Sequence, residues 1–336
     1  MSNLNKWSKG VNQFSISSVR KSKEKLTVLM PVRNGELFVE NSLKMITENI
    51  RSDDEIIVVD DASSDGTQVL LKSLCREIPQ LRVIKNKGKG IVDSLNLGIS
   101  EAENDLIARF DVDDKYPPQR LEVQRGRFGE STVALFSDYS FRKNGADFLG
   151  YVPSPIFPLP TGISLVNSQR TAHPSVLLNK GAVMEVGAYR TKDFPAEDLS
   201  LWLRLLRVGN LESIPSSLLH YNLSSTSTSG MHYRVAKQET RKLVKSLGIP
   251  RSLISEALET LDDCVADYRQ ETYSQERIML HMIDLQKAIS IFGCTDSQKR
   301  KFRNLIVQEM LKKSSLTAGI SIAYWKTRRF YFRFKK

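Results

Sequence analysis

The stretch Leu106–Asp114, Leu-Ile-Ala-Arg-Phe-Asp-Val-Asp-Asp, joins a short apolar run to three carboxylates within four positions. The apolar run is typical of a buried strand, and the acids follow at the point where this strand should end. Like charges this close repel one another unless a cation lies among them. Carboxylate oxygens suit Mg²⁺ or Mn²⁺, which commonly share them with substrate phosphates. The alternative is an acidic turn that caps the next helix, because Asp favours turns and N-caps.

Strands and helices alternate on both sides of this stretch, beginning at residue 26. The apolar runs predict strands at 26–32, 55–59, 81–84 and 106–110, and helices at 37–50, 66–77 and 91–102. Near-continuous apolar strands between amphipathic helices indicate an α/β protein, with a mostly parallel, Rossmann-like sheet sandwiched by helices. Ligands bind such sheets at the carboxyl ends of the strands. Polar clusters lie at those ends, in residues 31–35, 60–61 and 111–114.

The patterns divide the chain into four parts. We expect a polar N-terminal arm at 1–25, an α/β domain at 26–230, a helical appendage at 231–315 and a basic aromatic tail at 316–336. Within the α/β domain, a further helix should open near Pro117-Pro118. More strands are predicted at 133–136, 148–152 and 175–178, and a helix at 199–207.

Composition narrows the class of protein. With 336 residues, 40% hydrophobic and 26% charged, the chain is typical of a globular protein with a sizeable core. Its three cysteines are widely spaced and form no CxxC or Cys/His ligand pattern, which favours a reducing cytoplasm over a disulfide framework or a zinc site. No apolar run suggests a secretory signal or a membrane span.

The net charge of +11 belongs to one end of the chain. Residues 297–336 hold 12 Lys and Arg against one acid, Glu309, so the rest is balanced. A nucleic-acid-binding function for the whole chain is therefore not expected. In the tail, aromatic residues alternate with cations, which suits an anionic membrane surface. RNA binding and a terminal helix that docks on the body are the alternatives.

A second polar cluster ends the strand predicted at 55–59. Asp61 could accept hydrogen bonds from a base or ribose, as an acid does in dinucleotide folds. Asp65 is expected to be structural, as a cap of the next helix, and Asp60 could serve either purpose. The loop 86–90, Asn-Lys-Gly-Lys-Gly, could approach a diphosphate through backbone N–H groups and lysine charge, although such loops are also common turns.

The third cluster is Glu197-Asp198, at the start of the helix predicted near 199–207. A carboxylate here could act as a general base toward a hydroxyl. The alternative is ordinary helix design, since acids are favourable at a helix N-terminus. His173, before the strand predicted at 175–178, is a candidate for lining the same site, although a lone His is more often structural.

Four segments in this order resemble the family 2 glycosyltransferases, which have the GT-A fold. They are Val28–Asn34, Val59–Thr67, Ile107–Asp114 and Glu197–Arg204, within a resemblance that covers roughly residues 25–225. The resemblance implies a nucleotide-diphospho-sugar donor, a divalent metal (Mg²⁺ or Mn²⁺) and inversion at the anomeric carbon. A UDP-sugar is the expected donor, and a glycan or lipid-linked hydroxyl the expected acceptor, at the cytoplasmic face of a membrane.

The resemblance also implies roles for single residues. Pro31 and Arg33 match the loop that packs against the base, and Asp61 matches the acid that meets it. Asp198 matches the catalytic base, with Glu197 beside it. The DxD region, which touches ribose and metal, corresponds to Asp111 for the nucleotide and to Asp113 and Asp114 for the metal.

Two departures from the family pattern refine these expectations. The chain has no Q-x-x-R-W motif, so a single sugar addition is favoured over polymerisation. Leu95 precedes Asn96 where many relatives have Arg, which shifts the expected diphosphate contacts to Lys87 or Lys89. The alternatives are a non-catalytic nucleotide-sugar-binding or scaffold protein, and a sugar-phosphate nucleotidyltransferase.

Overall fold

The computed structural model describes residues 24–143, 150–152, 171–223, 235, 238–239, 242–243 and 295–301. The strands are β1 (Leu26–Val32), β2 (Glu55–Asp61), β3 (Leu81–Asn86), β4 (Leu106–Arg109), β5 (Thr132–Lys143), β6 (Gly150–Val152), β7 (Leu177–Asn179) and β8 (Asn210–Leu223). The α-helices are α1 (Val39–Thr47), α2 (Thr67–Glu77), α3 (Ile91–Glu101), α4 (Arg120–Arg127), α6 (Lys180–Glu185) and α7 (Glu197–Leu205). Two short 3-10 helices are η4 (His173–Ser175) and η5 (Thr191–Asp193).

The chain divides into two compact units, one of residues 1–157 and 164–248 and one of 158–163 and 249–336. The named elements all belong to the first unit. In the second unit, residues 296–301 are helical, and Thr295 caps this helix in a reciprocal pair of hydrogen bonds with Gln298. Most of the expected appendage, the N-terminal arm up to residue 23 and the basic aromatic tail lie outside the described residues.

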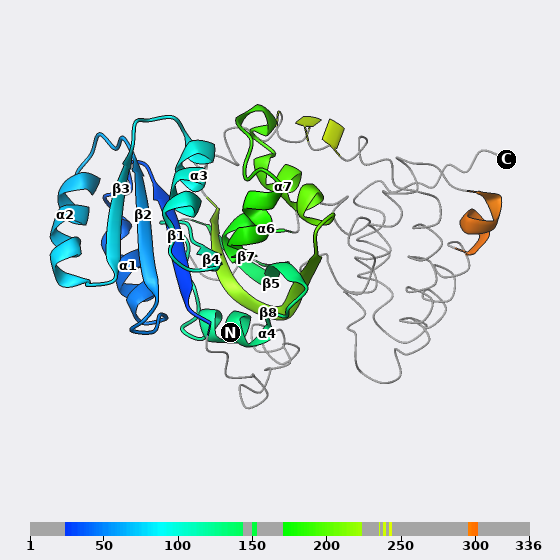
Figure 1. Ribbon diagram of the computed structural model, residues 1–336, viewed down its shortest axis with the longest axis horizontal. Coiled ribbons are helices and arrows are strands. Elements are labelled where there is room, and N and C mark those ends of the chain that lie inside the picture. The colour runs from blue at the N-terminus through cyan, green and yellow to red at the C-terminus, as the bar shows by residue number, and fades with distance from the viewer. Residues whose placement is uncertain are drawn as a thin grey trace, which may run out of the picture. The chain divides into compact units, whose positions relative to one another are not determined.

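One eight-stranded sheet forms the centre of the first unit (Figure 1). Its order is β3-β2-β1-β4-β7-β5-β6, and β8 pairs with β5. The four strands β3, β2, β1 and β4 are parallel, and so is the β5–β8 pair. β7 runs antiparallel to both of its neighbours, as does β6 to β5. The expected GT-A architecture, with a mostly parallel sheet, is confirmed.

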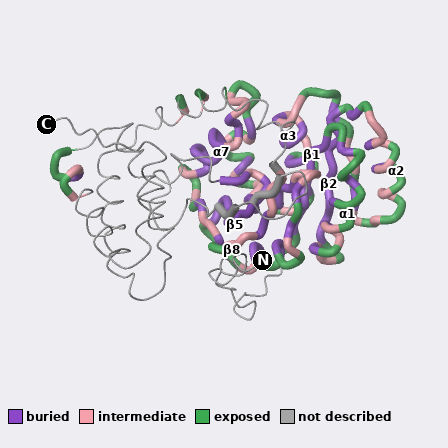
Figure 2. The backbone as a smooth tube through the Cα atoms, turned by 180° about the vertical axis from the view of Figure 1, so that it is seen from behind, coloured by how far each residue is buried: buried purple, intermediate pink, exposed green. Residues whose placement is uncertain are grey.

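Helices cover both faces of the parallel half. Alternate residues of β1, including Val28 and Met30, pack in one core cluster with residues of α1 and α2. Leu29, between them, faces α3, where a Cβ added to Gly98 would lie 2.1 Å from the Leu29 Cδ1. All seven residues of β1 and of β2 are buried, as the purple strands of Figure 2 show. Burial on both faces explains why these strands are continuous apolar runs.

The structure corrects the expected elements in three places. The segment at 175–178 is not one strand, because Pro174 and Ser175 belong to η4 and pairing starts at Leu177. The first helix starts at Val39 and not at 37, because residues 35–38 form a turn closed by the Phe38 N–H and the Gly35 carbonyl at 2.9 Å. The long strand β8 was not expected at all, and it supplies a residue of the candidate site.

Candidate active site

Asp61, at the end of β2, contacts Arg33 and two residues of the loop 86–90, Asn86 and Gly90. Its carboxylate accepts hydrogen bonds from Asn86 Nδ2 at 2.9 Å and from the Gly90 N–H at 3.3 Å. Arg33 Nη1 lies 3.8 Å from Asp61 Oδ2. The Arg33 side chain is 60% exposed and the Asp61 side chain only 7%, so the guanidinium closes over a buried carboxylate.

Two other residues expected to bind the donor, Pro31 and Lys89, lie at the same carboxyl-terminal edge of the sheet, which we call the donor edge. Pro31 is buried in β1 and pairs in register with Val59, two residues before Asp61. Lys89 is exposed between two glycines that both have positive φ, 73° at Gly88 and 94° at Gly90. A side chain would be strained at either glycine, so the loop holds Lys89 in a turn that glycine permits.

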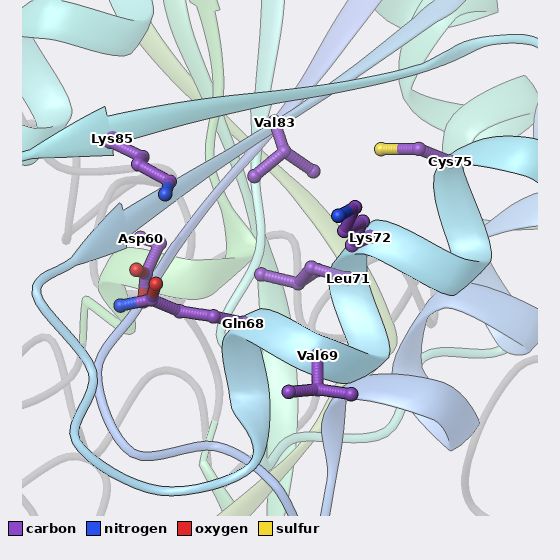
Figure 3. A pocket seen from close by; sticks show the side chains of 8 residues that line it. All are labelled: Asp60, Gln68, Val69, Leu71, Lys72, Cys75, Val83 and Lys85. Carbon is purple, nitrogen blue, oxygen red and sulfur yellow. The ribbon is translucent and has the colours of Figure 1, made fainter.

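Asp60 does not join this group. Successive residues of a strand face opposite sides of the sheet, so Asp60 points away from Asp61. Asp60 lies beside a shallow pocket of about 540 Å³ between β3 and α2, shown in Figure 3. Its Oδ1 accepts the Ser63 N–H at 3.2 Å, which supports the turn after β2. The expected nucleotide contact of Asp60 is therefore separated from those of Asp61 and Arg33.

The turns after β1 and β2 are tied to each other. The Asn34 N–H donates to Ser63 Oγ at 2.9 Å, and the Ser64 N–H donates to Asn34 Oδ1 at 2.8 Å. Asp65 accepts from the Thr67 N–H and from the Glu36 N–H, so its function is structural. It is not the expected helix cap, because the N-cap of α2 is Gly66, and Asp65 instead joins the loop to the turn after β1. These bonds fix the two loops that carry Arg33 and Asp61.

The acidic cluster after β4 is held by two residues that the sequence did not single out. Arg109 Nη1 lies 2.5 Å from Asp111 Oδ2. Asn222 of β8 donates its backbone N–H to Asp114 Oδ1 at 2.7 Å and its Nδ2 to Asp113 Oδ2 at 3.5 Å. β8 therefore closes over the cluster from a position 108 residues further along the chain.

The electrostatic environment of this acidic cluster favours the binding of a cation. Burial raises the pKa of Asp113 and of Asp114, and the charge of Asp111 raises both further. Asp114 is only 3% exposed, and its Oδ2 has no hydrogen-bond partner among the described residues. In the described part of the chain no three His, Cys, Asp or Glu side chains converge on one metal position. Mg²⁺ usually takes one or two carboxylates and completes its shell with water and substrate phosphates, so Asp113 and Asp114 fit such an ion.

Arg109 is a buried cation that is paired with Asp111 of this cluster. The residue is 6% exposed, and Asp111 keeps its pKa above the ordinary value although burial acts in the opposite direction. Its charge lowers the pKa of Asp113 and Asp114, and also that of the second acidic pair, Glu197 and Asp198. One buried guanidinium therefore acts on both groups of candidate site residues.

Glu197 and Asp198 form the first turn of α7. Asp198 Oδ1 accepts the N–H of Leu199 at 2.6 Å. Burial raises the pKa of Asp198 and, together with the charge of Asp198, raises the pKa of Glu197 to about 7. The following residues are core, with Trp202 packed edge-on against Phe136 at 5.0 Å between ring centroids. The pair therefore lies at the N-terminal end of a tightly packed helix, with Glu197 buried.

His173 lies beside this helix. Its Nε2 is 2.7 Å from the Tyr189 hydroxyl oxygen, and its ring meets Trp202 edge-on. Burial, and then the charge of Arg109, hold the pKa of His173 well below its usual value, so the imidazole is neutral. This places the candidate His173 next to α7, in contact with Tyr189 and Trp202.

The raised pKa of Glu197 makes stability depend on pH. Between the ordinary value of 4.5 and about 7 the folded protein holds this proton and the unfolded chain does not, so stability falls as pH rises through that window. Glu197→Gln removes the effect. We expect the variant to be more stable than the wild type at pH 8, by about 1–3 kcal/mol, and to gain nothing at pH 4. Denaturant unfolding at the two pH values measures this, with the exposed Glu101→Gln as control, and an equal difference at both pH values would contradict it.

Known proteins are similar to this chain over most of the α/β domain. A family model, Glycosyl transferase family 2, matches residues 27–186. EpsE of Bacillus subtilis, which is named as a glycosyltransferase, is 30% identical over 197 residues, covering 55% of this chain and 68% of that protein. WfgD of Escherichia coli, a UDP-Glc:alpha-D-GlcNAc-diphosphoundecaprenol beta-1,3-glucosyltransferase, is 24% identical over 226 residues, 64% of this chain and 83% of that protein.

Solved structures show the same fold. TarS 1–349 of S. aureus, in complex with UDP, aligns with a TM-score of 0.55 and 14% identity over 93% of this chain and 94% of that one. The fold and the order of the acidic clusters define a GT-A glycosyltransferase. The chain belongs to glycosyl transferase family 2.

Proposed function

We propose that this glycosyltransferase transfers a single sugar from a nucleotide-diphospho-sugar, with UDP as the expected nucleotide, to a hydroxyl of a glycan or lipid-linked acceptor. The transfer is metal-dependent and inverts the anomeric carbon.

The observation that carries the proposal is the placement of two acidic clusters. Asp113 and Asp114 are held after β4 by Asn222, and Glu197 and Asp198 form the first turn of α7. The buried Arg109, which lies 2.5 Å from Asp111, acts on the charge of both clusters. The leaving diphosphate gains negative charge, which a bound cation can neutralise. The acceptor hydroxyl loses a proton, which a carboxylate can accept. One acidic cluster suits each of these two tasks.

The donor side binds and orients the nucleotide. Asp61 is fixed by Asn86 and the Gly90 N–H, so one carboxylate oxygen remains directed toward Arg33 and the donor edge. We assign Asp61, Pro31 and Arg33 to the base, Asp111 to the ribose and Lys89 to the diphosphate. A divalent cation held by Asp113 and Asp114 would neutralise the charge that develops on the leaving diphosphate.

The acceptor side removes a proton. Asp198 would accept the proton of the acceptor hydroxyl while that oxygen attacks the anomeric carbon from the face opposite the diphosphate. Its fixed bond to the Leu199 N–H leaves the second oxygen for this step. Glu197, with a pKa of about 7, is partly protonated at neutral pH and can donate a hydrogen bond beside it.

The proposed acceptor is linked to a lipid, and the proposed location of the enzyme is a membrane surface. The name of WfgD describes a sugar addition to a diphosphoundecaprenol-linked sugar, which supports a lipid-linked acceptor. We place the reaction at the cytoplasmic face of a membrane. Within the described residues, no helix combines the length and the apolar character required to cross a bilayer. The basic aromatic tail at 316–336 would then give peripheral contact with anionic lipid.

A panel of nucleotide sugars tests this function through release of nucleoside diphosphate. We expect release from one donor with Mn²⁺ or Mg²⁺ and its loss with EDTA. Asp113→Asn should lower turnover by about 100-fold or more, because it removes a metal ligand. Asp105→Asn, an exposed acid at the opposite end of β4, is the matched control and should keep full activity.

The other outcomes separate the alternatives. Equal release with EDTA would refute the metal, and release of pyrophosphate from a sugar phosphate and a nucleoside triphosphate would indicate a nucleotidyltransferase. Binding of a nucleoside diphosphate without any turnover, with lipid-linked acceptors present, would favour the non-catalytic binding protein.

A further inference from the structure

The segment between α6 and α7 is bonded to helices on both sides of the candidate site. Asn96 of α3 accepts the Tyr189 N–H at 3.0 Å and donates Nδ2 to the Tyr189 carbonyl at 2.9 Å. Arg204 of α7 donates to the carbonyls of Val186 and Ala188, at 2.6 Å in each case. We call residues 86–90 the donor loop. Helix α3, which follows the donor loop, and helix α7, which begins with Glu197 and Asp198, are thus both bonded to the segment 186–190.

The Tyr189 side chain extends this connection into the core. It is 4% exposed, and its hydroxyl oxygen lies 2.7 Å from His173 Nε2. The His173 ring in turn meets the Trp202 ring of α7 edge-on, with 5.7 Å between centroids and an interplanar angle of 82°. Tyr189 is therefore fixed by α3 through its backbone and reaches α7 through His173.

The charges of the acidic pair and of Arg109 also act on the Tyr189 hydroxyl. Burial is the main cause that raises the Tyr189 pKa, but the charges of Asp198 and Glu197 raise it as well, and that of Arg109 lowers it. The phenol thus stays protonated and the His173 imidazole stays neutral. Their hydrogen bond is therefore between two neutral groups.

The two ends of this connection carry the two halves of the proposed reaction. α3 starts after Gly90, whose N–H bonds Asp61, and α7 starts with the acidic pair. A sugar that leaves a diphosphate at the donor loop for a hydroxyl at Asp198 must span the gap between these two helix starts. Misplacement by about 1 Å between reacting groups can cost on the order of 100-fold in rate.

We propose that Tyr189 is a positioning residue, which sets the place of the Glu197–Asp198 turn relative to the donor loop through its hydrogen bond to His173. The inference rests on the proposed function, because it concerns the alignment of that reaction. Tyr189 touches neither donor nor base in this assignment, and it acts through His173 and α7.

Tyr189→Phe tests the inference, because it removes one oxygen and keeps the ring and the Asn96 bonds. We expect kcat to fall about 10- to 100-fold with the donor KM within about twofold, since alignment is lost and donor binding is kept. His173→Phe should have the same effect, and the double variant should lose no more than either single one. His173→Gln gives the Tyr189 hydroxyl a new polar partner. Its kcat should therefore be closer to the wild-type value than that of His173→Phe.

Two comparisons make the result decisive. Tyr139→Phe removes another buried phenol, on β5, and should keep wild-type kcat. If the wild type is active and Tyr189→Phe is equally active, the inference is overturned and the proposed function stands. The same holds if kcat of His173→Gln falls as far as that of His173→Phe. An inactive wild-type protein, tested with the full donor panel and lipid-linked acceptors, would overturn the proposed function and this inference with it.

Discussion

Replacing Asp198 by Asn should reduce turnover by about 1000-fold at saturating donor, because a general base contributes about 10²–10⁴-fold and an amide cannot take the proton. Asn has the same shape, and its carbonyl oxygen can still accept the Leu199 N–H that Asp198 Oδ1 accepts. Donor binding uses the other end of the site, so the affinity for a nucleoside diphosphate should change by less than about threefold. Initial rates and calorimetric titration measure the two quantities.

The neighbouring acid Asp193 provides the control for this variant. It accepts a hydrogen bond from Ser200 of α7, which an Asn at the same position can also accept, so Asp193→Asn should keep at least a third of the activity. In the wild type, the acid limb of the pH–rate profile should lie above the ordinary range of Asp, since burial raises the pKa of Asp198. If Asp198→Asn turns over as fast as Asp193→Asn, another group is the base.

The parallel half of the fold could be predicted because each strand is buried on both faces. Such a strand has no polar side to interrupt the apolar run, and β1 to β4 were found within a few residues of their observed bounds. β8 lacks this signal, since its sequence contains a proline and several serines. It is held by pairing with β5 across three irregularities of register, and this partner is far away in sequence.

The same contrast holds within the candidate site. Asp61, its loop partner Gly90 and the start of α7 are set by local strand ends and turns, which a single sequence reveals. The alternation of side chains along a strand also predicts that Asp60 and Asp61 lie on opposite faces of the sheet. Arg109 was visible as a lone charge in an apolar strand. Asn222 had no local signal, because its contact with Asp114 exists only once β8 has folded back over β4.

A buried ion pair at the other end of the sheet gives the largest expected effect on stability. Arg125 of α4 and Asp54, before β2, have fully buried side chains and are joined at two points, Nη2 to Oδ2 at 2.7 Å and Nη1 to Oδ1 at 3.1 Å. Asp54 also accepts the N–H groups of Leu26 and Arg51. We expect Asp54→Ala to lower the free energy of unfolding of this unit by about 3–5 kcal/mol, because the buried guanidinium then keeps only the half-exposed Glu122, whose Oε1 lies 3.6 Å from Arg125 Nε, as a counter-charge.

A double-mutant cycle separates the pair from the general effect of losing a side chain. Arg125→Met leaves Asp54 with two N–H donors, so it should cost less than Asp54→Ala, and the double variant should cost clearly less than the sum. The exposed pair of Arg82 and Glu101, at 3.3 Å, is the matched control, and Glu101→Ala should cost at most about 1 kcal/mol. Urea unfolding followed by circular dichroism measures all four. An Asp54→Ala variant as stable as Glu101→Ala would show that water reaches the guanidinium, and that α4 is not held to β1 and β2 by this charge.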